Sequence, residues 1–350
     1  CFLLGENVTS SFSPVIHAMF GNNNYFLNSV SADSLEIFLK SKQFRGANVT
    51  IPYKSTVIKH LDFLSAECAL IGSVNTIKNC SGVLFGYNTD LFGMEYMLNR
   101  AKIDLKDKEV LILGSGATSK TAQFTTQKLK AKSIFFASRN GDINYDNIYE
   151  KCNPQVIINT TPVGMIGKCD DILVDIIRFK NLESVADVIY NPLNTRLLQS
   201  AKREGLKYTN GLSMLVAQAS AANEIFFDEK SNSQKIEEAI RAVKSKMLNV
   251  ALIGMPGSGK SVVGEKLAEM LSKTFIDIDK NLENSEKSAI CDIFKKYGES
   301  KFRLLESEEI KNISKKTDAV ISTGGGCVLN TENIVNLKKN AVIVWIKRDI

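Results

Sequence analysis

The sequence predicts an α/β fold with two or three domains, and three observations support that prediction. The 350 residues exceed the size of one ordinary domain. Between Asn48 and Ile240, short β-branched runs alternate with helical patterns, which is typical of parallel strands covered by helices. Two glycine-rich loops, which begin at Gly114 and Gly254, each follow an apolar run directly. A strand that leads through glycines into a helix can place a phosphate group at the helix N-terminus.

The predicted strands of the first part are short and rich in β-branched residues. They cover Ala47–Ile51, Val110–Leu113, Ser133–Ala137, Val156–Ile158 and Val185–Val188. The segment Asp228–Lys246 is polar and rich in Lys, Glu and Ser. We therefore expect a helical linker or a solvated helix there, with a second α/β unit beyond it.

The second unit is predicted to open with a strand at Asn249. Its first helix is expected at Ser261–Leu271, directly after the second glycine loop. Further strands are predicted at Thr274–Ile278, Ala319–Ser322 and Ala341–Ile346. No solenoid-type repeat is visible in the sequence, so we expect two different α/β units in series.

The composition is that of an ordinary globular protein, with 44% hydrophobic and 23% charged residues. No apolar run approaches the length of a membrane span, and the net charge of +6 forms no basic block. We therefore expect neither a membrane nor a nucleic acid as a partner. The two histidines and seven cysteines form no metal-like cluster and no C-x-x-C pair. This pattern favours reduced thiols in the cytoplasm and leaves a plastid or another organelle open.

The first glycine loop, Gly114-Ser-Gly116-Ala117-Thr-Ser, has two of the three glycines of a dinucleotide-binding fingerprint. Its glycines would let the backbone approach a pyrophosphate at the N-terminus of the following helix. The next predicted strand leads into Ser138-Arg139-Asn140, where an acidic residue would bind the ribose hydroxyl of NAD. An arginine suits the 2′-phosphate of NADP instead. The alternatives are a tight turn at the loop and a solvated charge at Arg139.

Seven further segments along the same part of the chain form a second, more specific pattern. In order they are Ser11-Phe-Ser13-Pro14, Asn48-Val-Thr-Ile-Pro-Tyr-Lys54, Gly72-Ser-Val-Asn75-Thr, Gly86-Tyr-Asn-Thr-Asp90, Asn159-Thr-Thr-Pro-Val-Gly-Met165, Asp187-Val-Ile-Tyr190-Asn-Pro and Asn210-Gly-Leu-Ser-Met-Leu-Val-Ala-Gln218. From residue 1 to about residue 228, the chain resembles the shikimate dehydrogenase family. The resemblance implies a substrate lobe, a Rossmann-like cofactor lobe, and NADP-linked, reversible reduction of 3-dehydroshikimate to shikimate.

The resemblance also implies a role for each matching residue. Lys54 and Asp90 would form the catalytic pair, because reducing a ketone by hydride needs a proton donor at its oxygen. The substrate would be bound by Ser11, Ser13, Thr50, Asn75, Tyr190 and Gln218. The cofactor NADP would be bound by Gly114, Gly116, Ala117, Ser138, Arg139, Asn140, Thr160, Met165, Gly211 and Met214. Taken singly, Asn75 could also be a turn former, Asp90 a helix cap and Lys54 a surface charge.

The chain departs from the family at several of these positions. Ala117 stands where the family usually has glycine, and Ser10 stands where it has histidine. Asn140 follows Arg139 in place of the usual threonine, and the family's second basic residue is not found just beyond it. These departures soften the preference for NADP and leave quinate open as a substrate. The alternative is a quinate/shikimate dehydrogenase with a non-catalytic nucleotide-binding C-terminal segment.

The second glycine loop runs from Gly254 to Ser261 and fits the P-loop pattern G-x-x-x-x-G-K-[ST] at every position. Backbone N–H groups of such a loop wrap the phosphates of ATP, here at Gly257, Ser258 and Gly259. Lys260 would reach the β- and γ-phosphate oxygens, and the Ser261 hydroxyl would ligate Mg²⁺. The loop by itself predicts a nucleoside triphosphate and names no phosphoryl acceptor.

The segments after this loop indicate the acceptor. They are Phe275-Ile-Asp277-Ile-Asp279, Ala289-Ile-Cys-Asp-Ile-Phe294, Gly298-Glu299, Phe302-Arg303, Glu306 and Ser322-Thr-Gly324-Gly325-Gly326. This series resembles shikimate kinase. The resemblance implies that Asp277 helps to hold Mg²⁺ through water, that Asp279 grips the ring hydroxyls and assists the attacking one, and that Arg303 pairs with the substrate carboxylate. The substrate ring would approach the backbone of Gly324, Gly325 and Gly326. A surface helix pair of Arg303 and Glu306, and a plain glycine loop, are the alternatives.

The combined interpretation is a shikimate dehydrogenase fused to a C-terminally truncated shikimate kinase, in which one product is the next substrate. The predicted divisions are a substrate-binding domain (1–92), an NADP-binding domain (93–209), a return helix (210–228), a linker (229–247) and a partial kinase domain (248–350). Because the family's later segments would lie beyond Ile350, we expect weak nucleotide binding and little phosphorylation. Further domains of the same pathway, upstream of Cys1 or downstream of Ile350, are left open.

Overall fold

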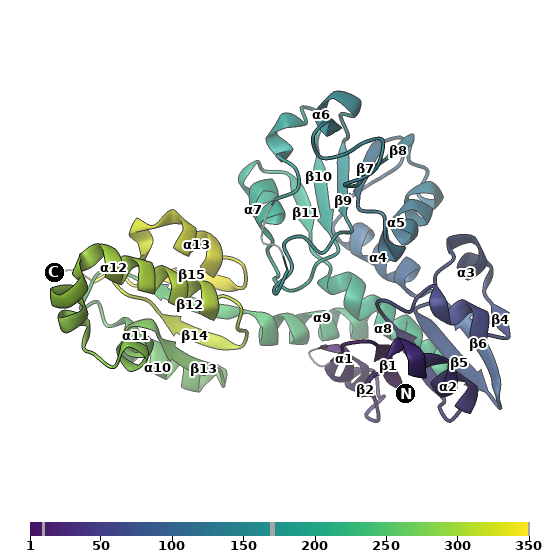
Figure 1. Cartoon of the computed structure of the whole chain (residues 1–350), viewed down its shortest axis with the longest axis horizontal. Helices are drawn as coiled ribbons and strands as arrows, with labels where there is room; N and C mark the ends of the chain where they lie inside the picture. Colours follow the sequence, from purple (N-terminus) through teal and green to yellow (C-terminus); the bar gives the residue numbers. More distant parts are fainter. Residues whose placement is uncertain (9–10, 169–171, 349–350) are drawn as a thin grey trace. The chain divides into compact units, whose positions relative to one another are not determined.

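The structure is a computed structural model that describes residues 1–8, 11–168 and 172–348, so the departure at Ser10 lies outside the described residues. The chain forms two compact units. The first consists of Cys1–Val163, Ile172–Tyr190 and Leu197–Val243, and the second of Gly164–Asp171, Asn191–Arg196 and Lys244–Ile350. Figure 1 shows the two sheets of the first unit and the smaller sheet of the second.

The first sheet of the first unit is mixed, with strand order β2-β1-β3-β5-β6-β4. Its strands are β1 (Phe2–Gly5), β2 (Phe26–Ser29), β3 (Gly46–Val49), β4 (Phe63–Leu64), β5 (Thr76–Cys80) and β6 (Val83–Tyr87). Strand β5 runs antiparallel to β3 and β6, so the prediction of parallel layers is wrong here. The reason is a two-residue hairpin turn at Ser81 and Gly82, both with positive φ, which joins β5 directly to β6.

The second sheet of the first unit is parallel, with strand order β11-β10-β9-β7-β8. Its strands are β7 (Glu109–Leu113), β8 (Ser133–Ala137), β9 (Val156–Asn159), β10 (Ser184–Asp187) and β11 (Lys207–Thr209). Parallel pairing is confirmed in this sheet, and the four strands that the sequence predicts lie within one residue of their predicted bounds. Val110–Leu113 is fully buried, as is typical of parallel strands with helices on both faces.

Helices and short 3-10 turns cover these sheets. They are α1 (Ser13–Met19), α2 (Ala32–Ser41), η1 (Thr56–His60), α3 (Ala66–Ile71), α4 (Asp90–Arg100), α5 (Ala117–Lys128), α6 (Ile148–Lys151), η2 (Ile176–Arg178), α7 (Arg196–Arg203), α8 (Leu212–Phe227) and α9 (Ser233–Met247). Helix α8 packs against α4 and α1, and α4 also packs against α5. The close α4–α8 crossing needs Gly93, because a Cβ there would lie 2.6 Å from the Met214 carbonyl oxygen. Helix α8 thus contacts strand β5 of the mixed sheet and helix α4, which packs on the first helix of the parallel sheet.

The predicted helical linker is confirmed as a helix, α9, although it begins later than the polar segment does. Asp228 adopts the left-handed conformation that ends α8. Helix α9 starts at Ser233, where the side chain of Asn232 accepts the N–H of Lys235.

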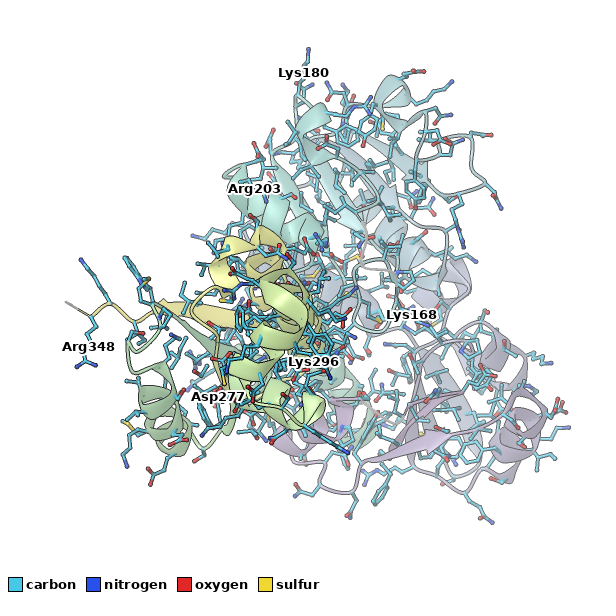
Figure 2. The ribbon with its side chains drawn as sticks, turned by 60° about the vertical axis from the view of Figure 1, so that its left-hand side comes forward. Lys168, Lys180, Arg203, Asp277, Lys296 and Arg348 are labelled. Atoms are coloured by element: carbon cyan, nitrogen blue, oxygen red, sulfur yellow. The ribbon has the colours of Figure 1, made fainter. Side chains whose placement is uncertain are left out.

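The second unit is a parallel sheet with strand order β13-β14-β12-β15. Its strands are β12 (Asn249–Ile253), β13 (Thr274–Asp277), β14 (Ala319–Ser322) and β15 (Ala341–Trp345), each within one residue of prediction. Its helices are α10 (Lys260–Leu271), α11 (Ile278–Glu286), α12 (Ile290–Ile313), η3 (Cys327–Leu329) and α13 (Thr331–Leu337). Figure 2 shows Asp277 within this unit and the exposed Arg348 side chain beyond the end of β15.

Three further features of the described residues concern their helices, their cysteines and their metal-ligating side chains. None of the described helices combines the length and apolar character that crossing a membrane requires. The cysteines of the described part of the chain are free thiols in the structure. Within that same part, no three metal-ligating side chains of the His, Cys, Asp or Glu type come together.

Candidate active sites

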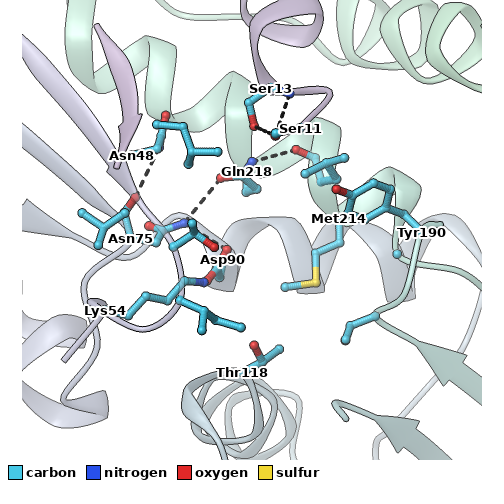
Figure 3. A pocket seen from close by; sticks show the side chains of 17 residues that line it. Ser11, Ser13, Asn48, Lys54, Asn75, Asp90, Thr118, Tyr190, Met214 and Gln218 are labelled. Carbon is cyan, nitrogen blue, oxygen red and sulfur yellow. Dashed lines mark hydrogen bonds and ion pairs between the residues drawn. The ribbon is translucent and has the colours of Figure 1, made fainter. Parts of the chain in front are cut away.

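The first unit contains a cavity of about 230 Å³ where β3, the starts of α1, α4 and α5, and the first half of α8 meet. It collects all eight residues predicted for catalysis and substrate binding, and Gly211 and Met214 with them. The eight are Ser11, Ser13, Thr50, Lys54, Asn75, Asp90, Tyr190 and Gln218. In Figure 3, Lys54 and Asp90 face each other on one side, Ser11 and Ser13 lie at the top of the view, and Thr118 lies at the start of α5.

Lys54 and Asp90 form an ion pair in this cavity. The Nζ atom of Lys54 lies 2.6 Å from Oδ2 of Asp90, and the two side chains are 16% and 10% exposed. The other carboxylate oxygen, Oδ1, accepts a hydrogen bond from Nδ2 of Asn75 at 2.9 Å. Asn75 is held in turn by the backbone N–H of Thr89, which donates to its Oδ1 at 2.7 Å. The pair is therefore oriented by a buried amide and is no loose surface contact.

Other polar groups converge on the same space. Ser11 Oγ donates to Ser13 Oγ at 2.9 Å, directly before Pro14 in the first turn of α1. Gln218 Nε2 donates to the Leu215 carbonyl, which turns Oε1 toward Asn75 Nδ2 at 3.4 Å. Burial raises the pKa of Tyr190, so its hydroxyl stays protonated and can donate. A ligand with several hydroxyl or carboxylate oxygens would find donors on three walls of this cavity.

The predicted cofactor residues lie mainly at the carboxyl ends of the parallel strands. Gly114 follows β7, Ser138 follows β8 and Thr160 follows β9. Because β8 and β9 lie on opposite sides of β7, this is the edge where α/β sheets bind their ligands. A Cβ on Gly114, whose φ is +112°, would lie 2.8 Å from Oγ1 of Thr160, whereas one on Gly116 would meet nothing within 4 Å.

Of the ten predicted cofactor residues, Gly211 and Met214 line the cavity, and the other eight are not part of its lining. Arg139 and Asn140 are exposed in the loop after β8, so the 2′-phosphate and solvated-charge interpretations of Arg139 both stay predictions. Ala117 starts α5 beside the loop. Met165 falls in the segment Gly164–Asp171, which is grouped with the second unit.

Sequence reasoning missed two polar residues that line the cavity, Asn48 and Thr118. Asn48 is 4% exposed and is the first residue of the segment that ends at Lys54. An asparagine inside the predicted strand Ala47–Ile51 was a usable signal, since a polar side chain that is buried in a strand needs a partner. Thr118 lies in the first turn of α5, and its place in the glycine loop was the corresponding signal.

The second unit contains a larger cavity of about 480 Å³ between the P-loop, α11, α12 and the triple glycine. Its lining includes most of the residues predicted for the kinase: Gly257, Gly259, Lys260, Ser261, Asp279, Arg303, Gly324, Gly325 and Gly326. Ser258 and Asp277 are not part of the lining. Asp277 lies behind it, where its Oδ2 accepts a hydrogen bond from Ser261 Oγ at 2.6 Å. Its Oδ1 accepts the N–H of Asp279 and caps α11.

The P-loop lysine is turned onto its own loop. Lys260 Nζ donates to the carbonyl oxygens of Gly254 and Met255, each at 2.8 Å. Gly325 packs on the ring of Pro256, where an added Cβ would lie 2.5 Å from Cδ. The two glycine-rich segments of this unit are thus in direct contact.

Three buried polar atoms of this cavity have no hydrogen-bond partner among the described residues. They are Asp279 Oδ1, Arg303 Nε and Glu306 Oε1. Glu306 is 0% exposed and holds Arg303 Nη1 at 2.8 Å, so the alternative of a surface helix pair is wrong. Burial, with the charges of Asp277 and Glu306, raises the pKa of Asp279. The unpaired carboxylate oxygens of Asp279 and Glu306 can accept hydrogen bonds from ligand hydroxyl groups, and Arg303 Nε can donate to a ligand carboxylate.

Comparison with known proteins places these two sites in families. Residues 3–77 match the family model described as shikimate dehydrogenase substrate binding domain, and residues 256–350 match the one described as shikimate kinase. The shikimate dehydrogenase (NADP(+)) of Clostridium perfringens strain SM101 is 37% identical over 263 residues, which are 68% of this chain and 97% of the relative.

Two solved structures are similar in fold and sequence. A chorismate mutase/shikimate 5-dehydrogenase fusion protein from Clostridium acetobutylicum superposes with a TM-score of 0.66 at 33% identity, over 70% of this chain and 97% of that one. Shikimate 5-dehydrogenase from Thermus thermophilus, in complex with NADP(H) and shikimate, superposes with a TM-score of 0.61 at 29% identity, over 69% and 98%.

The fold and the first site thus define a two-lobed, Rossmann-like oxidoreductase. The chain belongs to the shikimate dehydrogenase family. Its C-terminal unit carries a shikimate kinase segment, and the prediction of a fusion between the two families is confirmed.

Proposed function

We propose that the first unit catalyses the reversible, NADP-linked reduction of 3-dehydroshikimate to shikimate. The observation that carries the proposal is the Lys54–Asp90 ion pair of 2.6 Å, held inside a cavity whose walls are lined with hydroxyl and amide groups. The curated relative is named a shikimate dehydrogenase (NADP(+)), and the Thermus thermophilus structure contains NADP(H) and shikimate.

The proposed substrate roles follow from the chemistry of the ring. Its carboxylate is bound by the hydroxyls of Ser11 and Ser13 and by Tyr190, which all act as donors. Asn75 and Gln218 bind ring hydroxyls, and Thr50 closes the edge of the cavity.

Lys54 supplies the proton that the ketone oxygen takes up, and accepts it again in the reverse direction. Asp90 holds the ammonium group at that oxygen through the 2.6 Å contact. It also keeps the charge of the ammonium compensated in a site that is largely removed from water.

The residues that would hold NADP fit that group. The open space at Gly116 and the start of α5 can receive a pyrophosphate, flanked by Gly114, Ala117 and Thr160. Ser138, Arg139 and Asn140 would bind the 2′-phosphate. Gly211 and Met214 would contact the nicotinamide side, and the bound nicotinamide supplies the hydride. We also propose the predicted division, in which residues 1–92 and 210–228 belong to the substrate lobe and 93–209 to the cofactor lobe.

Reduced-nicotinamide absorbance tests this proposal when the full chain is mixed with shikimate and NADP. Lys54→Ala should lower kcat by about 100-fold or more, the range of a lost general acid. Lys78→Ala is the matched control, because Lys78 also pairs with an aspartate, Asp228, at 2.6 Å but lies outside the cavity. A wild-type chain that turns over quinate faster than shikimate would support the quinate alternative. Equal activity of Lys54→Ala and Lys78→Ala would refute the assigned role.

We further propose that the second unit binds ATP and Mg²⁺ at the P-loop and shikimate beside it, for transfer of the γ-phosphoryl group. The P-loop residues Gly257, Ser258, Gly259 and Lys260 would bind the phosphates, and Ser261 and Asp277, joined at 2.6 Å, would hold Mg²⁺ directly or through water. Shikimate would lie against Asp279, Arg303 and the backbone of Gly324, Gly325 and Gly326.

Two measurements on the full chain test this second proposal. ADP release that depends on shikimate would identify an active kinase. Stabilisation of the second unit by ATP and Mg²⁺ without such release would identify the non-catalytic alternative. Lys260→Ala should remove either effect, because it deletes the charge that reaches the β- and γ-phosphates. If neither effect occurs in the wild-type chain, the proposed nucleotide site is wrong.

We also propose a cytoplasmic location, which cell fractionation would test.

A further inference from the structure

A buried series of hydrogen bonds runs from Tyr25 to the catalytic pair. Tyr25 is 4% exposed, and its hydroxyl donates to Oδ1 of Asn48 at 2.8 Å. Nδ2 of Asn48 donates to Oγ1 of Thr76 at 3.0 Å. Oγ1 of Thr76 donates to Oδ1 of Asn75 at 3.1 Å, and Nδ2 of Asn75 donates to Asp90. Asn48, Asn75 and Asp90 line the cavity, whereas Tyr25 and Thr76 do not.

The hydrogen bonds of this series have one direction, which the Tyr25 hydroxyl sets at one end and the backbone N–H of Thr89 supports at Asn75. Burial raises the pKa of Tyr25 well above its usual value, so the phenol keeps its proton and must donate it. A donor can face only the amide oxygen of Asn48, which turns the NH₂ group of Asn48 toward Thr76. The hydroxyl of Thr76 accepts that N–H and is free to donate its own hydrogen to Asn75. The Asn75 oxygen is thereby occupied, and its NH₂ group faces Asp90.

The ring of Tyr25 is itself held in place by two helices. His17 of α1 stacks on it with ring centroids 3.7 Å apart and an interplanar angle of 8°. His17 Nδ1 lies 3.1 Å from Oδ1 of Asn223 on α8, and Asn22 donates to the same oxygen. The hydroxyl of Tyr25 therefore has little freedom to leave Asn48.

We infer that Tyr25 is a positioning residue for the proposed reaction, acting through Asn48, Thr76 and Asn75 on the Asp90 carboxylate and, through it, on Lys54. This inference rests on the proposed dehydrogenase function and extends it to a residue outside the cavity. Because Tyr25 does not line the cavity, its loss should reduce kcat more than it raises KM. The backbone N–H of Thr89 also donates to Asn75, so the effect should be smaller than that of removing Lys54.

Tyr25→Phe in the full chain removes the hydroxyl and keeps the stacked ring. We expect kcat for shikimate oxidation to fall about tenfold, the size of one lost buried hydrogen bond, with KM changed less than about twofold. Tyr96→Phe is the matched control, because the Tyr96 hydroxyl also donates to a side chain, Glu237 at 2.7 Å, away from the catalytic cavity. It should keep wild-type kcat.

A second pair of variants tests the route. Thr76→Val keeps the shape of the side chain but removes the hydroxyl, and it should lower kcat to a similar extent. Thr76→Ser restores the hydroxyl and should recover most of the lost rate, which a purely structural role would not predict.

The outcomes separate this inference from the function on which it rests. No turnover of shikimate by the wild-type chain would overturn the proposed function and the inference together. Wild-type turnover with Tyr25→Phe as fast as Tyr96→Phe would overturn the inference alone. Equal loss in Thr76→Ser and Thr76→Val would also overturn it, because the hydroxyl would then not carry the effect.

Discussion

Lowering the pH from 7 to 5 should destabilise the first unit through one buried side chain, His17. This residue is 1% exposed, and burial lowers its pKa to about 4 from the usual 6.5. The unfolded chain takes up a proton at this histidine near pH 6.5, whereas the folded chain does so only near pH 4. The stability that His17 provides is therefore present above pH 6.5 and is lost as the pH falls toward 4.

The magnitude follows from the two pKa values. Linkage gives a loss of about 2 kcal/mol in the free energy of unfolding between pH 7 and pH 5, rising to about 3 kcal/mol below pH 4. The structural cause is burial, because the charged form of the imidazole would lose its contact with water. His17 Nε2 has no hydrogen-bond partner among the described residues, and the ring lies between Tyr25 and Phe226.

Hydrogen exchange followed by mass spectrometry can measure this loss on the full chain. It resolves peptides of the first unit, whereas fluorescence of the single tryptophan, Trp345, reports on the second. Exchange in peptides of β1 and β3 gives the opening free energy at pH 7 and at pH 5, after correction for the intrinsic exchange rate.

Two replacements isolate the contribution of the imidazole. His17→Gln and His17→Phe differ in size and polarity and share only the loss of an ionisable ring. Both should lack about 2 kcal/mol of the wild-type pH dependence, even if their stabilities at pH 7 differ. If the wild-type chain and both variants lose the same stability between pH 7 and pH 5, the reasoning is refuted.

Three further predictions concern the other site residues. Gly211→Ala should destabilise the first unit by about 3 kcal/mol or more, seen by hydrogen exchange, because the new Cβ would lie 1.9 Å from the Val188 carbonyl oxygen; wild-type protection would contradict this. Arg303→Met should destabilise the second unit by about 3 kcal/mol, because it leaves the buried Glu306 carboxylate unpaired. The loss should appear as a lower urea midpoint of Trp345 fluorescence, and an unchanged midpoint would count against it. Arg139→Ala should raise KM for NADP about tenfold and leave KM for NAD within about twofold. Equal changes for both cofactors would show that Arg139 does not read the 2′-phosphate.

Local sequence patterns predicted the elements of both units well. Strands β8 and β14 have their predicted bounds, and both glycine loops lie between a strand and a helix as expected. These features depend on neighbouring residues, because β-branched runs favour strands and glycine permits the turn between strand and helix. The antiparallel β5–β6 pair was not predicted. Its local signal is the two-residue turn Ser81-Gly82, which is weaker than the β-branched runs that mark the parallel strands.

The burial and partners of single side chains were harder to predict. Glu306 looked equally suited to a solvent-exposed helix face, since its spacing from Arg303 is the same in either case. Only the packing of α12 against the triple glycine buries it: a Cβ on Gly324 would lie 2.4 Å from Glu306 Oε1. Asn48 and Tyr25 were likewise not selected from the sequence, because nothing local shows that Tyr25, just before β2, is hydrogen-bonded to Asn48 in β3.

By itself, the sequence determined the order of strands and helices, the two phosphate-binding loops and, through its motifs, the two families. Those features depend on residues that are near neighbours in the chain, where backbone preference and spacing act directly. Tertiary structure alone decided which distant groups meet. Lys54 and Asp90 are 36 residues apart and Asn75 and Gln218 are 143 apart, yet the packing of α8 against α4 places all four around one cavity. Such contacts depend on the burial of whole helix and sheet faces, which no short segment of sequence specifies.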